Sequence, residues 1–182
     1  MWVNRAVVIP TGGEIMDGTV LDTVSPAVIF SLIRMNPLCT VYRAAPIEDE
    51  QNIIRRAVEY WVCEGMELVV LIGGSGGGHR HCTTLSEDYT WSALDKLLDE
   101  KASREIWGKN GHMWCKLVCG RRKGALVINL PGPHSEAKAA IEAFCRVYPQ
   151  NSKGLEEINA AMMQAVLAQY PVNDVNEVQH RD

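Results

Sequence analysis

The sequence lacks any long apolar run, and this absence narrows the class of protein first. The longest uninterrupted apolar segments are far shorter than the ~20 residues that a membrane-spanning helix needs. The first ten residues also lack the length and the cleavage pattern of a secretory signal peptide. We therefore expect no membrane partner and a cytoplasmic location.

Positive charge is scarce as well. The chain carries 18 Lys and Arg against 22 Asp and Glu, a formal net charge of -4. A basic face is the electrostatic footprint of a nucleic-acid-binding protein, so we expect no nucleic-acid partner. Internal repeats and low-complexity segments are also absent. The 182 residues, 47% of them hydrophobic, fit a single globular domain.

Paired cysteine motifs are missing too. The six cysteines are scattered, mostly in apolar segments, and no two have C-x-x-C spacing. Disulfide frameworks belong to short secreted chains, so reduced thiols in the core are expected here.

Short apolar segments alternate with amphipathic ones along most of the chain. We expect strands at 5–10, 38–45 and 68–72, helices at 25–36, 49–64 and 84–100, a hairpin of 113–119 with 125–130, and helices at about 133–147 and 155–169. Ser25 is the expected N-cap of the first helix. Residues 14–24 are expected to be irregular, 101–111 to be a surface excursion, and the tail after Pro171 to be frayed.

This alternation predicts a three-layer α/β/α fold with a mostly parallel sheet and a late antiparallel hairpin. Residues 1–150 would form the domain. Residues 151–182 would add a C-terminal helix and tail packed on it.

A glycine cluster after the apolar run Leu68–Ile72 is the most distinctive segment. Successive backbone N–H groups in such a loop can cradle a phosphate, and ligands of open α/β sheets bind beyond the carboxyl ends of the strands. No lysine follows the cluster as a P-loop requires. The dinucleotide fingerprint matches only weakly, because Gly74 and Gly76 supply two of its glycines but His79 stands at the third position.

Five ordered segments resemble the molybdopterin-binding domain family, which includes molybdopterin adenylyltransferases, molybdotransferases and the competence/damage-inducible proteins. They are Thr11-Gly12-Gly13-Glu14, the segment from Gly18 to Thr23, Pro46-Ile47-Glu48-Asp49, Gly73-Gly74-Ser75-Gly76 with Arg80 and Thr83, and the segment from Leu130 to Glu136.

The resemblance implies that molybdopterin, a pterin phosphate, is the ligand or substrate. The implied ligand-binding residues are Thr11, Gly12, Asp22, Gly73, Gly74, Ser75, Gly76, Arg80, Thr83, Pro131, Gly132, Pro133, Ser135 and Glu136. It also implies adenylyl transfer from ATP with Mg²⁺. The implied catalytic residues are Asp49 (or its neighbour Glu48) and the residue at the position of His81. Family members are commonly trimers, so a homo-oligomer is implied.

Two positions depart from the family pattern. Gly13 stands where the first turn has an acid, and His81 replaces the Asp of the glycine-rich loop. Magnesium prefers oxygen ligands, so His81 argues against family-type adenylyl transfer. Two alternatives stay open: a non-catalytic relative used for binding or sensing, and a nucleotide-processing hydrolase of the competence/damage-inducible type. The segment Pro133-His134-Ser135-Glu136 slightly favours the hydrolase.

Several of these residues also have plainer interpretations. Asp49 and Thr83 could be helix N-caps, Asp22 could cap the turn before Pro26, and Glu136 could simply complement a helix dipole. His79, His81 and Cys82 could suggest zinc, but we expect no bound metal because an extended segment would point Cys82 away from the histidines. The basic tip, Arg121-Arg122-Lys123, is expected to be a solvated turn rather than a phosphate contact.

Overall fold

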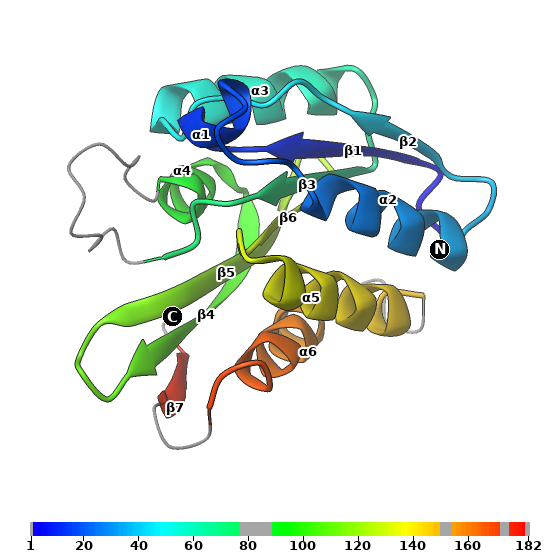
Figure 1. Ribbon diagram of the computed structural model, residues 1–182. Coiled ribbons are helices and arrows are strands. Elements are labelled where there is room, and N and C mark those ends of the chain that lie inside the picture. The colour runs from blue at the N-terminus through cyan, green and yellow to red at the C-terminus, as the bar shows by residue number, and fades with distance from the viewer. Residues whose placement is uncertain (1, 77–88, 150–153, 172–174, 181–182) are drawn as a thin grey trace.

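A computed structural model describes residues 2–76, 89–149, 154–171 and 175–180, the last range by its backbone pairing only (Figure 1). The elements in chain order are β1 (Arg5–Pro10), α1 (Gly13–Met16), α2 (Val24–Met35), β2 (Thr40–Arg43), α3 (Gln51–Cys63), β3 (Leu68–Ile72), α4 (Thr90–Leu97), β4 (Glu100–Gly108), β5 (Met113–Arg122), β6 (Ala125–Leu130), α5 (His134–Val147), α6 (Leu155–Leu167) and β7 (Val175–His180).

One sheet runs through the molecule. Among the described residues it has seven strands in the order β2-β1-β3-β6-β5-β4-β7. The strands from β2 to β6 pair in parallel, and β5, β4 and β7 extend the sheet antiparallel. The expected α/β fold with a late antiparallel hairpin is confirmed.

Strand residues alternate between two cores, one on each face of the sheet. Ala6 and Val8 of β1 belong to the core that α2, α5 and α6 cover, whereas Val7 and Ile9 belong to the core under α3 and α4. All four side chains are fully buried. A strand buried on both faces has a continuous apolar sequence, which explains why the parallel strands are recognisable from the sequence.

The antiparallel part of the sheet is larger than expected. The prediction of a surface excursion at residues 101–111 is wrong, because most of them form β4, which pairs with β5 on one side and β7 on the other. The expectation of a frayed tail is also wrong, because residues 175–180 form β7. The composition of β4 is charged, because it contains Lys101, Arg104 and Glu105. Its hydrogen bonds to β5 and β7 are made by backbone groups, which no pattern of side chains predicts.

Some helix starts also differ from expectation. Residues Gly13–Met16, expected to be irregular, form α1. Helix α2 begins at Val24, so Ser25 lies inside the first turn rather than at the N-cap. Its backbone N–H donates to Oδ1 of Asp22 at 2.9 Å, and Asp22 therefore supplies the capping acceptor. Helix α4 begins at Thr90; the part of the expected helix from 84 to 88 lies outside the described residues.

Two further findings concern disulfides and membrane-spanning helices. None of the five described cysteines forms a disulfide; Cys39, Cys115 and Cys119 are buried and Cys63 is exposed. In the described part of the chain, no helix is both long and apolar enough to cross a bilayer.

Candidate functional site

A cavity of about 530 Å³ lies at the carboxyl ends of β1, β3 and β6. Its wall combines the turn after β1, the glycine loop after β3 and the start of α5. The predicted ligand residues Thr11, Gly12, Asp22, Gly73, Gly74, Ser75, Gly76, Gly132, Pro133 and Glu136 all line it, together with Asp49. Segments from four separate parts of the sequence therefore converge where ligands of α/β sheets bind.

The glycine loop is held from behind through its carbonyl groups. The carbonyl of Gly74 accepts from the Trp91 backbone N–H at 3.3 Å, and that of Ser75 from the Lys116 N–H at 2.7 Å. The carbonyl of Gly76 accepts from the Trp91 indole Nε1 at 3.0 Å. Helix α4 and strand β5 thereby fix three successive peptide groups of the loop.

The amide N–H groups of Gly74, Ser75 and Gly76 have no hydrogen-bond partner among the described residues. Most buried backbone N–H groups in proteins are paired, and Ser75 is only 6% exposed. Three adjacent donors in a cavity wall, without a partner in the described part of the chain, form the type of concavity that binds anions. This arrangement can hold a phosphate group.

Gly74 fits its position because it has no side chain. Its φ is +58°, and a Cβ atom there would lie 2.3 Å from Oγ1 of Thr90 and 2.6 Å from Oδ2 of Asp49. Gly73 has a φ of +107°, and its Cβ would lie 2.8 Å from the Thr11 carbonyl oxygen. The two glycines let the loop turn back against β1 and α4.

Asp49 is buried and does not cap its own helix. The N-cap position of α3 is Glu50, and the Asp49 carboxylate accepts instead from Thr90 Oγ1 at 3.1 Å and from the Tyr89 N–H at 3.3 Å. Thr90 Oγ1 in turn lies 3.2 Å from Oγ1 of Thr11. The N-cap interpretation is therefore wrong, and Asp49 joins the turn after β1 to the start of α4 beside the glycine loop.

Asp22 is engaged in a different way. Arg43 donates to Asp22 Oδ2 from Nε and Nη2, at 3.1 and 2.7 Å. Burial would raise the pKa of Asp22, but hydrogen bonds from Ser25 and Arg43 outweigh it and hold the pKa below its usual value. Asp22 thus remains a carboxylate in the cavity wall.

Glu136 is a carboxyl group of the cavity wall and lies in the first turn of α5. Burial raises its pKa, and a hydrogen bond from the Tyr170 hydroxyl, at 2.9 Å from Oε2, partly offsets the shift. Its other oxygen has no hydrogen-bond partner among the described residues. A half-buried acceptor of this type can bind an N–H edge of a ligand.

Some predicted residues are not part of this cavity wall. Pro131 is buried and Ser135 is exposed, and neither lines the cavity. Arg80, His81 and Thr83 lie outside the described residues, as do His79 and Cys82. Among the described residues, no three His, Cys, Asp or Glu side chains are close enough to hold a metal ion.

Two aromatic residues of the cavity are missing from the sequence-based set. Trp114 stands at the start of β5 and Tyr170 follows α6, and their ring centroids lie 5.1 Å apart. The sequence pattern marks Trp114 only as a strand residue and Tyr170 only as the edge of a tail. Neither lies in a glycine-rich or acidic motif, so no local signal connects them to the site.

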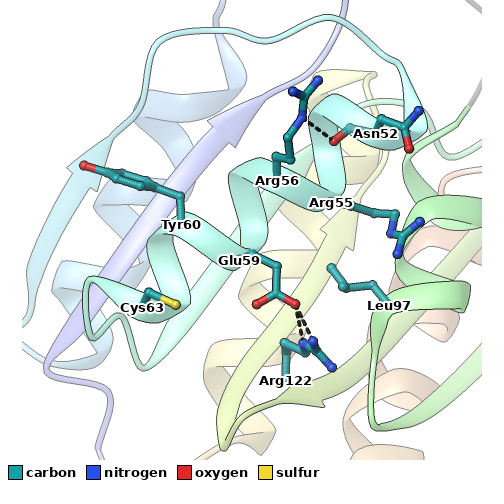
Figure 2. A pocket seen from close by; sticks show the side chains of 8 residues that line it. All are labelled: Asn52, Arg55, Arg56, Glu59, Tyr60, Cys63, Leu97 and Arg122. Atoms are coloured by element: carbon teal, nitrogen blue, oxygen red, sulfur yellow. Dashed lines mark hydrogen bonds and ion pairs between the residues drawn. The ribbon is translucent and has the colours of Figure 1, made fainter.

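The basic tip of the hairpin lies away from this cavity. The tip lies at the amino end of β6 and the cavity lies at its carboxyl end, so the length of the strand, about 17 Å, separates them. A second, more open cavity of about 810 Å³ lies there along α3 (Figure 2), and Arg55 and Arg56 point in different directions from the helix. Arg122 is bound by Glu59 of α3.

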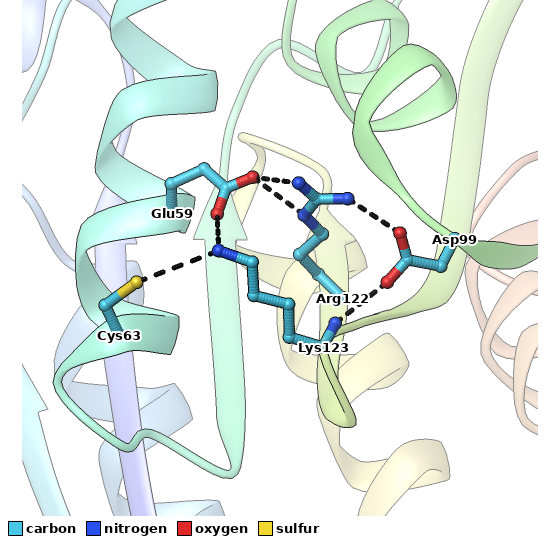
Figure 3. A network of polar contacts seen from close by, with 5 residues as sticks. All are labelled: Glu59, Cys63, Asp99, Arg122 and Lys123. Carbon is cyan, nitrogen blue, oxygen red and sulfur yellow. Dashed lines mark hydrogen bonds and ion pairs between the residues drawn. The ribbon is translucent and has the colours of Figure 1, made fainter.

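Figure 3 shows the ion pairs of the tip. Arg122 donates to Glu59 and to Asp99, at 2.7 and 2.6 Å, and Lys123 donates to Glu59 at 2.9 Å. The predicted solvated turn is thus exposed at Lys123 but bound to α3 by ion pairs, and it is too far from the cavity to contact a phosphate bound there.

The sequence from residue 7 to residue 150 matches the model of a family described as a probable molybdopterin binding domain. This stretch covers most of the chain and includes the glycine loop and the turn before α5. The chain therefore belongs to this family of molybdopterin-binding domains.

Among curated proteins, the chain is similar to the molybdenum cofactor biosynthesis bifunctional protein of Chlorobaculum tepidum. The two are 32% identical over 111 residues, which are 58% of this chain and 34% of that protein. The match thus spans only about a third of the relative.

Two solved structures illustrate the shared fold. The molybdopterin biosynthesis enzyme MoaB from Thermus thermophilus matches with a TM-score of 0.63 at 23% identity, covering 91% of this chain and 97% of that one. The protein CinA from Thermoplasma acidophilum matches with a TM-score of 0.58 at 18% identity, covering 82% and 98%. At such identities the likeness establishes the fold.

Proposed function

We propose that this chain binds molybdopterin in the cavity at the carboxyl ends of β1, β3 and β6. The observation that carries the proposal is the row of backbone N–H groups at Gly74, Ser75 and Gly76, which have no partner among the described residues. The terminal phosphate of molybdopterin would accept these hydrogen bonds. Charge-assisted hydrogen bonds of this kind are stronger than neutral ones.

The start of α5 supports the same assignment. Gly132 lies directly beside the loop, because a Cβ at its position would be 4.0 Å from the Cα atom of Gly73. The first N–H groups of a helix lack intrahelical partners and favour an anion nearby. Two sets of backbone donors would therefore surround one phosphate.

Binding of purified molybdopterin to the protein tests this proposal, with Gly132→Asp and Gly132→Asn as a matched pair. A Cβ at this position would meet only the Cα atom of Gly73, at an ordinary contact distance of 4.0 Å, and the two replacements have nearly the same shape. The carboxylate of Gly132→Asp should repel the phosphate by about 1–4 kcal/mol and weaken binding roughly tenfold or more. Gly132→Asn should bind much more tightly than Gly132→Asp. Equal affinities of the two variants, or no binding by the native chain, would refute the proposal.

Adenylyl transfer is the second candidate function, with Asp49 and His81 as the catalytic residues. The carboxylates of the cavity are the ligand type that Mg²⁺ prefers, but the described residues alone do not form a metal site. The reaction is tested by mixing the protein with molybdopterin and ATP-Mg²⁺ and measuring pyrophosphate release. If only the His81→Asp variant transfers adenylate, the native chain is a binding or sensing relative. Release by the native chain would make it an enzyme, and hydrolysis of a nucleotide without molybdopterin would favour the competence/damage-inducible type.

A homotrimer remains a prediction, as does the cytoplasmic location. Large apolar side chains on α2 and near β2 are exposed, with Phe30 at 62% and Leu38 at 87%. Such residues are candidates for a contact between copies of the chain. Light scattering of the eluted protein would give the mass directly, and a monomer at micromolar concentration would contradict the prediction.

A further inference from the structure

Trp114 reaches the cavity because of a β-bulge. Ile106 of β4 pairs with Cys115 of β5, but the next residue, Trp107, pairs with Met113, so Trp114 is an extra residue. In a regular strand Trp114 and Cys115 would face opposite sides of the sheet. Here both pack against the core under α2, α5 and α6. A bulge can re-aim a side chain in this way, and it does so for Trp114.

The indole ring lies directly on the backbone of Gly108. A Cβ at Gly108 would be 2.4 Å from Cε2 and 2.5 Å from Nε1 of Trp114, so only glycine leaves room for the ring. Tyr170 lies against the indole, with the two ring planes tilted by 54°. Together with the Tyr170 hydroxyl, this pair brings an aromatic surface next to the Glu136 carboxylate.

We propose that Trp114, Tyr170 and Glu136 form a subsite for a fused heterocycle with a 2-amino-4-oxo pyrimidine edge. One ring face of the ligand would stack on an aromatic side chain, as nucleic-acid bases do on such surfaces. The ring N–H and the neighbouring amino group would both donate to Glu136. This inference deepens the proposed function and rests on it for the choice of a pterin.

Glu136 distinguishes between ring systems by the direction of hydrogen bonding. Pterin and guanine both present two adjacent donors, an amide N–H and an amino group, which match a carboxylate in bidentate geometry. Adenine presents an amino donor beside a ring nitrogen that accepts. A carboxylate facing that edge leaves one acceptor opposite another, so adenine is disfavoured.

The same ligand can reach both the ring subsite and the glycine loop. Gly132 stands next to Gly73, and Glu136 follows it by four residues, in the first turn of α5 and in the wall of the same cavity. A pterin or nucleotide monophosphate is long enough to extend from the loop to Glu136. Glu136 at one end of the site and the backbone N–H groups of the glycine loop at the other would therefore fix the orientation of a single bound ligand.

The test compares the affinities of 6-hydroxymethylpterin, GMP and AMP for the full chain, measured by calorimetry. The pterin lacks a phosphate and reports the ring subsite alone. We expect the pterin and GMP to bind and AMP to bind at least about tenfold more weakly than GMP. Glu136→Gln should weaken the pterin and GMP by about tenfold and leave AMP nearly unchanged, whereas Glu142→Gln on the exposed face of α5 should change none of them.

Gly108→Ala and Trp114→Leu test the aromatic surface. Both should weaken all three ligands, because stacking does not depend on the ring edge, and Trp2→Leu is the control. Tyr170→Phe keeps the ring and removes only the hydroxyl, so it remains informative if the bulge variants do not fold. It should weaken the pterin severalfold, since Glu136 loses the donor that orients it.

The outcomes separate this inference from the proposed function. AMP binding as tightly as GMP, or unchanged affinities in Glu136→Gln, would overturn the ring subsite while molybdopterin binding could still depend on Gly132. Guanosine, which lacks a phosphate as the pterin does, would support the subsite and contradict the choice of molybdopterin as ligand if it bound more tightly than the pterin.

Discussion

Substituting Gly74 with alanine should damage the fold and the candidate site together. A residue with a side chain at a φ of +58° costs about 1 kcal/mol. The new Cβ would also lie 2.3 Å from Thr90 Oγ1 and 2.6 Å from Asp49 Oδ2, and both side chains are buried. Relief requires breaking the hydrogen bond from Thr90 to the Asp49 carboxylate, worth about 1.5–3 kcal/mol.

The expected loss in the free energy of unfolding is therefore about 2.5–4 kcal/mol. In a chain of this size that corresponds to a fall of roughly 10 °C in Tm. Urea titration followed by circular dichroism gives the free energy, and a thermal scan gives Tm.

Gly18→Ala is the matched control for this prediction. Gly18 also has a positive φ, of +78°, but no heavy atom lies within 4 Å of the Cβ position. It should lose only the backbone contribution of about 1 kcal/mol. If Gly74→Ala were no less stable than Gly18→Ala, the packing of the loop against Asp49 and Thr90 would be refuted.

Three further predictions concern the polar groups. Lys116→Met should cost about 3–5 kcal/mol because it removes the cation 3.1 Å from the carboxylate of the buried Glu105; denaturant titration should show most of this loss recovered in the double variant with Glu105→Leu. Burial raises the pKa of Glu136 above its ordinary value of 4.5, so its carboxyl group stays protonated to a higher pH in the folded state than in the unfolded state. The contribution of Glu136 to stability should then fall as pH rises from 4.5 through the raised pKa, and unfolding curves of Glu136→Gln should lack this fall. Arg122→Ala should cost about 1 kcal/mol, less in high salt, since its partners Glu59 and Asp99 are partly exposed; an undiminished cost in salt would contradict an ionic origin.

The parallel half of the fold is predictable because its strands are buried on both faces. Val69 and Val70 point to opposite cores, so the apolar run itself is the signal. The antiparallel half is only partly predictable. In β4, Glu105 is buried by pairing with Lys116 across the strands, and a charged residue in a sequence normally indicates surface.

The site is predictable where a motif dictates the backbone. Gly73 and Gly74 are glycines because of their positive φ values and the close approach of Thr11 and Asp49. Trp114 is not predictable, since its direction depends on a one-residue bulge that the pairing of β4 with β5 creates. Tyr170 follows Glu136 by 34 residues, and their contact exists only in the folded structure.

Tyr170 also lies beyond residue 150, where the match to the family domain ends, yet it forms part of the cavity wall. The shared domain thus carries the glycine loop, and a segment outside the matched region carries one of the aromatic rings. Exchanging that segment between relatives would alter the ring end of the cavity and leave the loop untouched. The residues at the two ends of the cavity can therefore evolve, or be redesigned, independently of each other.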